Sequence, residues 1–232
     1  MTKTVVIHQP DFAPYLGFFH RFLHADEFIA LDHVQFVSGT SRSWMHRDKI
    51  KTPKGEQWLT LSTTKAPVGT AINKIALSRS VDWQRSNLDL IRENYRQAPY
   101  FDAVFPALAM AYEDPPSLMA DFNLRVMDLL GEMLDARLPR KLSSTMHPTG
   151  TRNEMLIDLL TKSGATHYLS GTGARAYMTV EKFTKAGIEV VWQDFRHPVY
   201  PQLHGSFIPY LSTLDALFNC GIEGSRKLLR GS

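Results

Sequence analysis

The chain opens with Val5-Val6-Ile7-His8-Gln9-Pro10, in which a β-branched apolar run gives way abruptly to polar residues and a proline. A segment with helical apolar spacing follows at Pro14-Tyr15-Leu16-Gly17-Phe18-Phe19-His20. This order is typical of a buried strand that passes polar side chains to a loop before a helix. Because α/β proteins build their sites at the ends of such strands, the sequence predicts a site in this N-terminal stretch.

The rest of the chain predicts an α/β fold. We expect strands at residues 4–7, 28–31, 168–169 and 189–192, and helices at 16–23, 82–98, 101–112, 115–134, 153–163 and 174–186. Helices that alternate with strands through short loops favour parallel pairing. We therefore expect a Rossmann-like, mostly parallel sheet flanked by helices. A basic, antiparallel β-flap at about 34–77 and a helical insertion at about 82–136 complete a single α/β domain over residues 1–232.

Composition indicates an ordinary globular protein. The 232 residues are 44% hydrophobic and 21% charged, and the net charge of +3 is compatible with anionic small molecules. No apolar stretch approaches the roughly 18 residues of a spanning helix. With no signal peptide and one cysteine, we expect a cytoplasmic protein without disulfides. Cys220 is read as a small buried residue beside a helix-ending glycine rather than as a nucleophile.

A second candidate site lies at Tyr168-Leu169-Ser170-Gly171-Thr172-Gly173-Ala174-Arg175, where a strand runs into small residues and then a helix. The N-terminus of such a helix offers backbone N–H groups to a phosphate or carboxylate. Ser170, Gly171, Gly173 and Arg175 are the expected binding residues. The alternative is a tight turn in which Thr172 caps the helix.

Two further segments are candidates. Residues 196–209 form a long loop with His197, His204 and three prolines, and loops of this length are often functional, although each histidine alone could be structural. Residues 41–51 interleave basic residues, Arg47 and Lys49 among them, with Trp44, a pattern that can hold phosphates and stack a base. The alternative for this segment is a solvated edge hairpin.

These stretches together resemble the WbqC-like protein family from residue 5 to about residue 221. The motifs that carry the resemblance are His8-Gln9-Pro10, Pro14-Tyr15-Leu16-Gly17-Phe18-Phe19-His20, Leu31-Asp32-His33-Val34-Gln35-Phe36, Lys51-Thr52-Pro53-Lys54-Gly55 with Trp58-Leu59-Thr60, Tyr168-Leu169-Ser170-Gly171, His197-Pro198-Val199-Tyr200-Pro201-Gln202 with Phe207-Ile208-Pro209, and Ser212-Thr213-Leu214-Asp215. The resemblance implies a bacterial protein associated with surface polysaccharide or O-antigen synthesis, in which acyl or aminoacyl transfer to an amino sugar is suspected. It places these residues at motif positions: His8, Gln9, Tyr15, His20, Asp32, Gln35, Arg47, Ser170, Gly171, His197, Tyr200 and Gln202.

The first functional hypothesis is therefore a transferase that acts on a nucleotide-linked amino sugar or another anionic small molecule. His8 or His197 is the expected base, with Asp32 as its orienting partner, and backbone N–H groups hold the oxyanion. The donor is an acyl thioester or an aminoacyl group, so nucleic acid is expected only as a tRNA that carries the donor. We expect no cofactor, and the spacing of the histidines fits no metal site.

Two alternatives remain open. The loop with Gly17 and His20 is weakly similar to the signature loop of nucleotidyltransferases, in which the glycine admits a nucleobase and the histidine binds phosphate. A non-catalytic protein that binds a nucleotide or nucleic acid through the basic flap is the other alternative. The oligomeric state is not predicted.

Overall fold

The computed structural model describes residues 1–37 and 43–231, which form two compact units. Each unit is assembled from three separate stretches of chain. The first unit comprises Met1–Gln9, His20–His33 and Arg137–Phe195, and the second comprises Pro10–Phe19, Val34–Ala136 and Arg196–Ser232. The predicted flap and helical insertion both belong to the second unit. The interpretation of the chain as a single domain stays a prediction.

The first unit is built on a five-stranded parallel sheet, which confirms the predicted α/β class. Its strands are β1 (Thr4–His8), β2 (Glu27–Ala30), β5 (Arg140–Leu142), β6 (His167–Ser170) and β7 (Glu189–Trp192). They lie in the order β5-β2-β1-β6-β7, and every neighbouring pair is parallel. Strand β5 was not predicted, because two of its three residues are charged and exposed.

Strand β1 is the centre of this sheet. Its apolar run is buried because helices and neighbouring strands cover it, and Val5 and Ile7 pack in one core with Ile29 of β2 and Tyr168 of β6. The pairing of β1 with β2 extends to His8 opposite Ala30, whereas the register of β1 with β6 covers only Thr4 and Val5. The pairing between β1 and β6 therefore ends before the carboxyl ends of the two strands.

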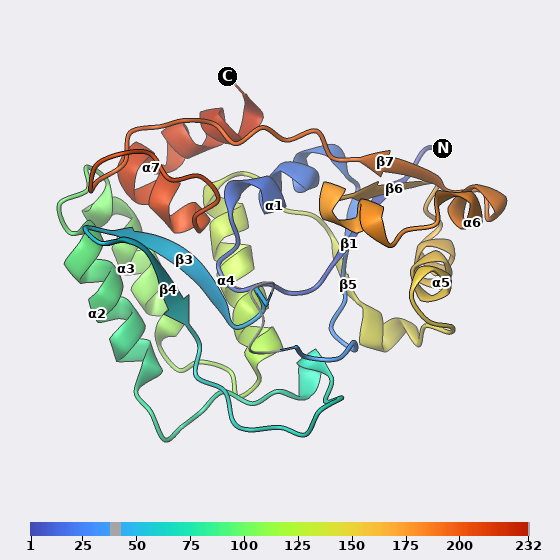
Figure 1. Cartoon of the computed structure of the whole chain (residues 1–232), viewed down its shortest axis with the longest axis horizontal. Coiled ribbons are helices and arrows are strands. Elements are labelled where there is room, and N and C mark those ends of the chain that lie inside the picture. The colour runs from blue at the N-terminus through green and yellow to red at the C-terminus, as the bar shows by residue number, and fades with distance from the viewer. Residues whose placement is uncertain (38–42, 232) are drawn as a thin grey trace. The chain divides into compact units, whose positions relative to one another are not determined.

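Short helices connect the strands of the first unit. They are η1 (Arg21–His24), η3 (Ser143–Met146), α5 (Asn153–Ser163), η4 (Thr172–Ala176) and α6 (Val180–Lys185). Figure 1 shows α6 beside β7 and α5 near α6. The predicted helix at 174–186 is wrong as a continuous element, since a short 3₁₀ turn ends at Ala176 and the α-helix begins only at Val180. Gly173 and Thr179 are weak helix formers, which explains the break.

The second unit contains the antiparallel hairpin and most of the longer helices (Figure 1). Its elements are α1 (Leu16–His20, whose last residue is counted with the first unit), β3 (Arg47–Thr52), β4 (Gly55–Thr60), η2 (Ile72–Lys74), α2 (Trp83–Tyr95), α3 (Phe101–Tyr112), α4 (Met119–Met133) and α7 (Thr213–Arg230). The hairpin turns at Pro53-Lys54, inside the predicted antiparallel flap. The last part of the predicted flap, residues 72–77, forms no strand, because η2 occupies its first half and only isolated bridges follow. Helix α4 begins later than predicted, after Pro115-Pro116.

No bounds were predicted for α7, although Gly221 was read as a helix-ending glycine, and the helix carries an internal break. Ser212 caps its N-terminus by accepting a hydrogen bond from Leu214 N, and the helical dihedrals are interrupted at Gly221, where φ is +72° and ψ is 178°. Gly221 thus ends the first half of α7, in keeping with the reading of this glycine as a helix end. Among the described residues, no helix has the length and apolar character that crossing a membrane requires.

Replacing Gly221 by alanine should lower the free energy of unfolding by about 2 kcal/mol or more. A Cβ atom would lie 2.7 Å from Tyr100 Cδ1, and the positive φ already disfavours any side chain. Gly164→Ala is the matched control, because Gly164 has the same φ of +72° but nothing within 4 Å of its Cβ position. Urea unfolding followed by circular dichroism measures both variants, and equal losses would show that the Tyr100 contact contributes nothing.

Candidate functional site

Polar residues gather at the carboxyl edge of the parallel sheet in the first unit. His8 ends β1 and Ser170 ends β6. Ser143 and Gln193 directly follow β5 and β7, and Asp32 lies two residues after the end of β2. Because the strands are parallel, these ends meet at one edge. From β1, the chain adds β2 and then β5 on one side. It then adds β6 and β7 on the other side, so the strand order reverses between β1 and β6. Ligands of open α/β sheets bind at such a switch point.

His8 is held as a neutral imidazole at this edge. Its Nδ1 lies 3.0 Å from the carbonyl oxygen of Gln9, which selects the tautomer with the proton on Nδ1. Burial, followed by the Arg21 guanidinium, lowers the pKa of His8 to about 3, and the hydrogen bond to Gln9 acts in the opposite direction. At neutral pH the imidazole is therefore an uncharged group with its acceptor lone pair on Nε2.

Arg21 brings a positive charge to the same edge. It is the first residue of η1, is only 4% exposed, and its Nη1 lies 3.8 Å from the position that a Cβ of Gly171 would take. Its charge contributes to lowering the pKa of His8 and opposes the rise that burial causes in the pKa of Tyr168. Arg21 is thus near the ends of both β1 and β6.

The side chain of His20, the last residue of α1, lies beside Gln193, which follows β7. Its Nδ1 is 3.4 Å from Gln193 Nε2, and its ring packs against His24 and Phe195 with centroids 4.7 and 5.1 Å away. Burial and then His24 lower the pKa of His20, while Asp194 opposes them. Gln193 Oε1 is 4.0 Å from the Cβ position of Gly171, which connects this group to the switch point.

Asp32 is anchored to η3. Its carboxylate accepts hydrogen bonds from Ser143 Oγ (2.9 Å), Ser144 N (2.8 Å) and Ser144 Oγ (2.6 Å). Ser143 Oγ also lies 2.6 Å from Nδ1 of His33. These bonds join the ends of β2 and β5. The expected role of Asp32 as the orienting partner of His8 stays a prediction.

The turn after β6 differs from the expected anion site. The helix that follows Gly171 is the five-residue η4, so the predicted N-terminus of a long helix is wrong, and η4 has no side-chain cap, so Thr172 does not cap it. Arg175 is exposed and lies 5.1 Å above the ring of Trp192. Gly173 is also exposed, whereas Ser170 is buried. Of the four residues predicted to bind an anion in this turn, two lie beside the switch point, Ser170 and Gly171.

A second group of predicted residues forms a buried polar network in the second unit. Asp215 of α7 is fully buried and accepts hydrogen bonds from Tyr95 Oη (2.7 Å), Tyr200 Oη (2.9 Å) and Gln202 Nε2 (2.8 Å). Lys51 Nζ donates to Gln202 Oε1 (3.1 Å) and to two carbonyls of the 196–212 loop. Burial raises the pKa of Asp215 and lowers that of Lys51. Tyr200 and Gln202 therefore hold this loop in place.

Aromatic rings connect His197 to Tyr15. The ring of Tyr210 lies 5.1 Å from His197 and 5.9 Å from Tyr15, and Phe207 lies 5.8 Å from His197. His197 Nδ1 is 2.9 Å from the carbonyl oxygen of Pro198, and burial lowers the pKa of His197 while that hydrogen bond opposes it. Tyr210 is 56% exposed and has a φ of +59°, a strained value for a bulky residue.

The predicted basic segment is divided between two environments. Arg47 and Lys49 lie 4.1 and 5.2 Å above the ring of Trp58, which also packs against Trp44, and Lys49 forms an ion pair with Glu56. Lys51, by contrast, belongs to the buried network. Ser41 and Arg42 lie outside the described residues. The remaining predicted residues have backbone roles, since Gln35 forms an isolated bridge with Ala71 and Gln9 accepts the His8 hydrogen bond.

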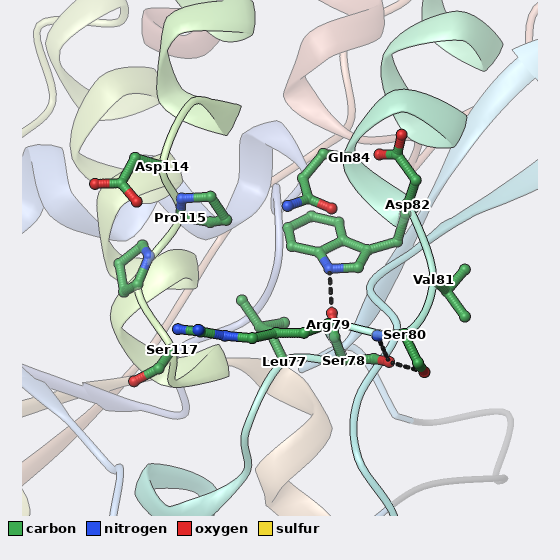
Figure 2. Close-up of a pocket in the computed structure, with 12 residues that line it drawn as sticks. Leu77, Ser78, Arg79, Ser80, Val81, Asp82, Gln84, Asp114, Pro115 and Ser117 are labelled. Carbon is green, nitrogen blue, oxygen red and sulfur yellow. Dashed lines mark hydrogen bonds between the residues drawn. The ribbon is translucent and has the colours of Figure 1, made fainter.

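Figure 2 shows a cavity of about 430 Å³ in the second unit, beside the N-terminus of α2. Arg79 extends toward Ser117 across it, and Trp83 Nε1 donates a hydrogen bond to the carbonyl oxygen of Ser78. Its remaining lining residues are Leu77, Ser80, Val81, Asp82, Gln84, Asp114, Pro115 and Pro116. None of the predicted site residues lines this cavity, which was not anticipated from the sequence.

Comparison with known proteins identifies one family for most of the chain. The model of the WbqC-like protein family matches residues 9–227. The chain belongs to this family. A relative in Mycobacterium tuberculosis, the uncharacterized protein Rv1507c, is 31% identical over 224 residues. This alignment covers 95% of each of the two chains. No solved structure matches the chain significantly.

The two proposed bases of this WbqC-like protein belong to different units, His8 to the first and His197 to the second. That they act in one site stays a prediction. Within the part of the chain that the structure describes, no group of three or more histidine, cysteine, aspartate or glutamate side chains could hold a metal ion. Burial, followed by Asp215, raises the pKa of Cys220 to about 11, which disfavours the thiolate.

Sequence reasoning missed Arg21 and Asp215 of this WbqC-like protein as residues of the two groups. Arg21 directly follows the motif that ends in His20, but a lone arginine in a helical pattern carries no signal of burial. Asp215 stands in the motif Ser212-Thr213-Leu214-Asp215, so its position was available from the resemblance. Its function as the common acceptor of three donors required the fold.

Proposed function

We propose that this WbqC-like protein is a transferase of bacterial surface-polysaccharide synthesis, which moves an acyl or aminoacyl group onto the amino group of a nucleotide-linked sugar. Family membership supports the pathway, because the family resemblance implies surface polysaccharide or O-antigen synthesis. The observation that carries the chemistry is the neutral His8 at the switch point of the parallel sheet, beside the buried charge of Arg21.

In the proposed step the sugar amine attacks the carbonyl carbon of the donor. The new C–N bond forms as the C–S bond of a thioester, or the C–O bond of an aminoacyl ester, breaks. The amine proton passes to His8 and then to the departing thiolate or alkoxide. A neutral imidazole is the form that can accept this proton. An anionic substrate beside Arg21 would offset part of the positive field and make His8 a stronger base.

The test is transfer by the purified protein, followed by mass spectrometry of the sugar nucleotide. Acyl-coenzyme A thioesters and aminoacyl-tRNAs are supplied as donors, and nucleotide-linked amino sugars as acceptors. We expect His8→Asn to reduce the rate by about 100-fold or more, since asparagine can keep the hydrogen bond to Gln9 but cannot accept the proton. His147→Asn, at an exposed histidine with a positive φ that asparagine tolerates, is the control.

Two results would contradict the proposal. Full activity of His8→Asn would remove His8 from the reaction. Binding of donor and acceptor by the wild-type protein with no transfer in any combination would favour the non-catalytic binding protein, in which the stack of Arg47 and Lys49 on Trp58 offers a face for a base.

Nucleotidyl transfer is the second candidate. The observation that favours it is the position of His20, which lies with Gln193 and Phe195 at the same sheet edge as His8. This function predicts release of pyrophosphate from a nucleoside triphosphate in the presence of a sugar phosphate. The acyl or aminoacyl transferase releases none.

A further inference from the structure

The cavity beside the N-terminus of α2 lies between two segments of the second unit that are fixed to each other. One segment leads into α2, and the other connects α3 to α4. The backbone N–H of Leu77 in the first donates to the carbonyl oxygen of Ser117 in the second (2.9 Å), and an isolated bridge joins Ala76 to Leu118. A ligand would therefore enter a preformed cavity and would have little chain to order.

Further contacts hold each wall of the cavity without using its charged side chains. Trp83 Nε1 donates to the carbonyl oxygen of Ser78 (3.2 Å). Arg125 Nη1 donates to the carbonyl oxygens of Glu113 and Asp114 (3.2 and 3.1 Å), and Asp114 has a φ of +42°, a value that aspartate tolerates better than most residues. The shape of the cavity thus depends on the backbone and on Trp83.

Charges of both signs line this cavity, yet they do not pair with one another. Arg79 is exposed, and its side chain makes no hydrogen bond or ion pair with the residues that the structure describes. The carboxylate of Asp114 is likewise exposed and unpartnered among those residues. Asp82 accepts a hydrogen bond from Arg85 N at the start of α2. A guanidinium and a carboxylate that share a preformed cavity without pairing are available to the opposite charges of a ligand.

The size and the balance of charge restrict the kind of ligand. The cavity volume of about 430 Å³ falls in the range of roughly 300–1,000 Å³ that is usual for small-molecule sites. A simple anion would be repelled by Asp82 and Asp114, and a simple cation by Arg79. The lining also contains apolar side chains that suit a hydrocarbon segment, namely Leu77, Val81, Pro115 and Pro116.

We infer that this cavity binds a small zwitterion of the amino-acid type, with its acidic group on Arg79 and its ammonium group on Asp114. The guanidinium offers paired N–H donors to a carboxylate, and the aspartate accepts N–H bonds from an ammonium group. The hydrocarbon part of the ligand packs on the apolar lining. This inference goes beyond the proposed function, because no residue of that site lines the cavity, and either can fail without the other.

The indole N–H of Trp83 reports occupancy, because it lies in the wall of the cavity. Its resonance is followed in proton–nitrogen correlation spectra during titration with glycine, β-alanine, γ-aminobutyrate and ε-aminocaproate, and Trp83→Phe assigns it. We expect a saturable shift with at least one of these zwitterions and no shift at Trp44, Trp58 or Trp192. Acetate and ethylamine, which carry one charge each, should bind about 10-fold more weakly or less well still.

Arg79→Gln and Asp114→Asn test the two charges separately. Each should weaken binding of the preferred zwitterion about 10-fold. Both should keep the wild-type melting temperature, because neither side chain has a partner among the described residues and asparagine tolerates the positive φ at this position. Arg85→Gln and Asp102→Asn, at exposed charges outside the cavity lining, are the matched controls and should bind as wild type does.

Three results would overturn the inference. The first is the absence of a saturable Trp83 shift with every zwitterion. The second is wild-type affinity in either Arg79→Gln or Asp114→Asn, since one charge would then have no part in binding. The third is binding of acetate, ethylamine or the uncharged sugar glucose as tightly as the best zwitterion, because the pair of charges would then not select the ligand.

Discussion

Acidification from pH 7 to pH 4 should lower the free energy of unfolding by about 3 kcal/mol through His8 alone. The pKa of His8 is about 3 in the folded protein, against 6.5 as the ordinary value that applies when the chain is unfolded. Between these values the unfolded chain binds a proton that the folded protein does not, so stability falls as the pH falls. Above pH 6.5 both states are neutral, and the effect disappears.

The measurement is a series of urea unfolding curves between pH 7.5 and pH 4, for wild type and His8→Asn. Burial also lowers the pKa values of His20, His33, His46 and His197, so the wild-type curve includes their losses as well. The difference in slope between wild type and His8→Asn isolates the contribution of His8. Parallel curves would contradict the neutral state of His8 on which the proposed transfer depends.

Asp215→Asn should cost about 3–5 kcal/mol of stability. Asp215 accepts hydrogen bonds from Tyr95, Tyr200 and Gln202, and an asparagine in its place has only one acceptor oxygen for these three donors. The NH₂ group of the asparagine would also face the donor groups of these neighbours and could accept no hydrogen bond from them. Burial lowers the pKa of Lys51, and the negative charge of Asp215 acts in the opposite direction. The substitution removes this negative charge, so the buried ammonium group of Lys51 loses its stabilisation.

Chemical denaturation of Asp215→Asn, compared with Glu93→Gln at an exposed position of α2, checks this expectation. A loss of less than about 1 kcal/mol would mean that the network can rearrange around a neutral side chain. Limited proteolysis provides a local readout, because Tyr200 and Gln202 lie in the long loop that the network holds. Faster cleavage within residues 196–212 is expected in Asp215→Asn and not in Glu93→Gln.

The elements that could be predicted from the sequence are those with strong local patterns. Strand β1 has a β-branched run bounded by polar residues and proline, and β7 was predicted with its observed bounds. Strand β5 could not be found, because a three-residue strand with two charged residues exists only through its pairing with β2. Helix α7 escaped prediction because Gly221 and Gly224 interrupt a pattern that tertiary packing stabilises.

The candidate site was predictable in part for the same reason. His8, Ser170 and Gly171 stand at strand ends, where residue order alone indicates a role, and the structure brings the ends of β1 and β6 to one sheet edge. Tyr200 and Gln202 looked like binding residues because they are polar groups in a long loop. Their partners, Asp215 and Lys51, come from distant parts of the chain, and no local pattern reports such contacts.

The position of β1 at the centre of its sheet also affects how the polypeptide is made. This strand leaves the ribosome long before its neighbour β6, which begins only at His167. During synthesis, one hydrogen-bonding side of an apolar strand therefore waits for a partner encoded far downstream, a delay that favours slow folding and exposes the nascent chain to aggregation. Ribosome-bound fragments that stop before His167 should consequently depend on chaperones, and release from that dependence should coincide with the emergence of β6.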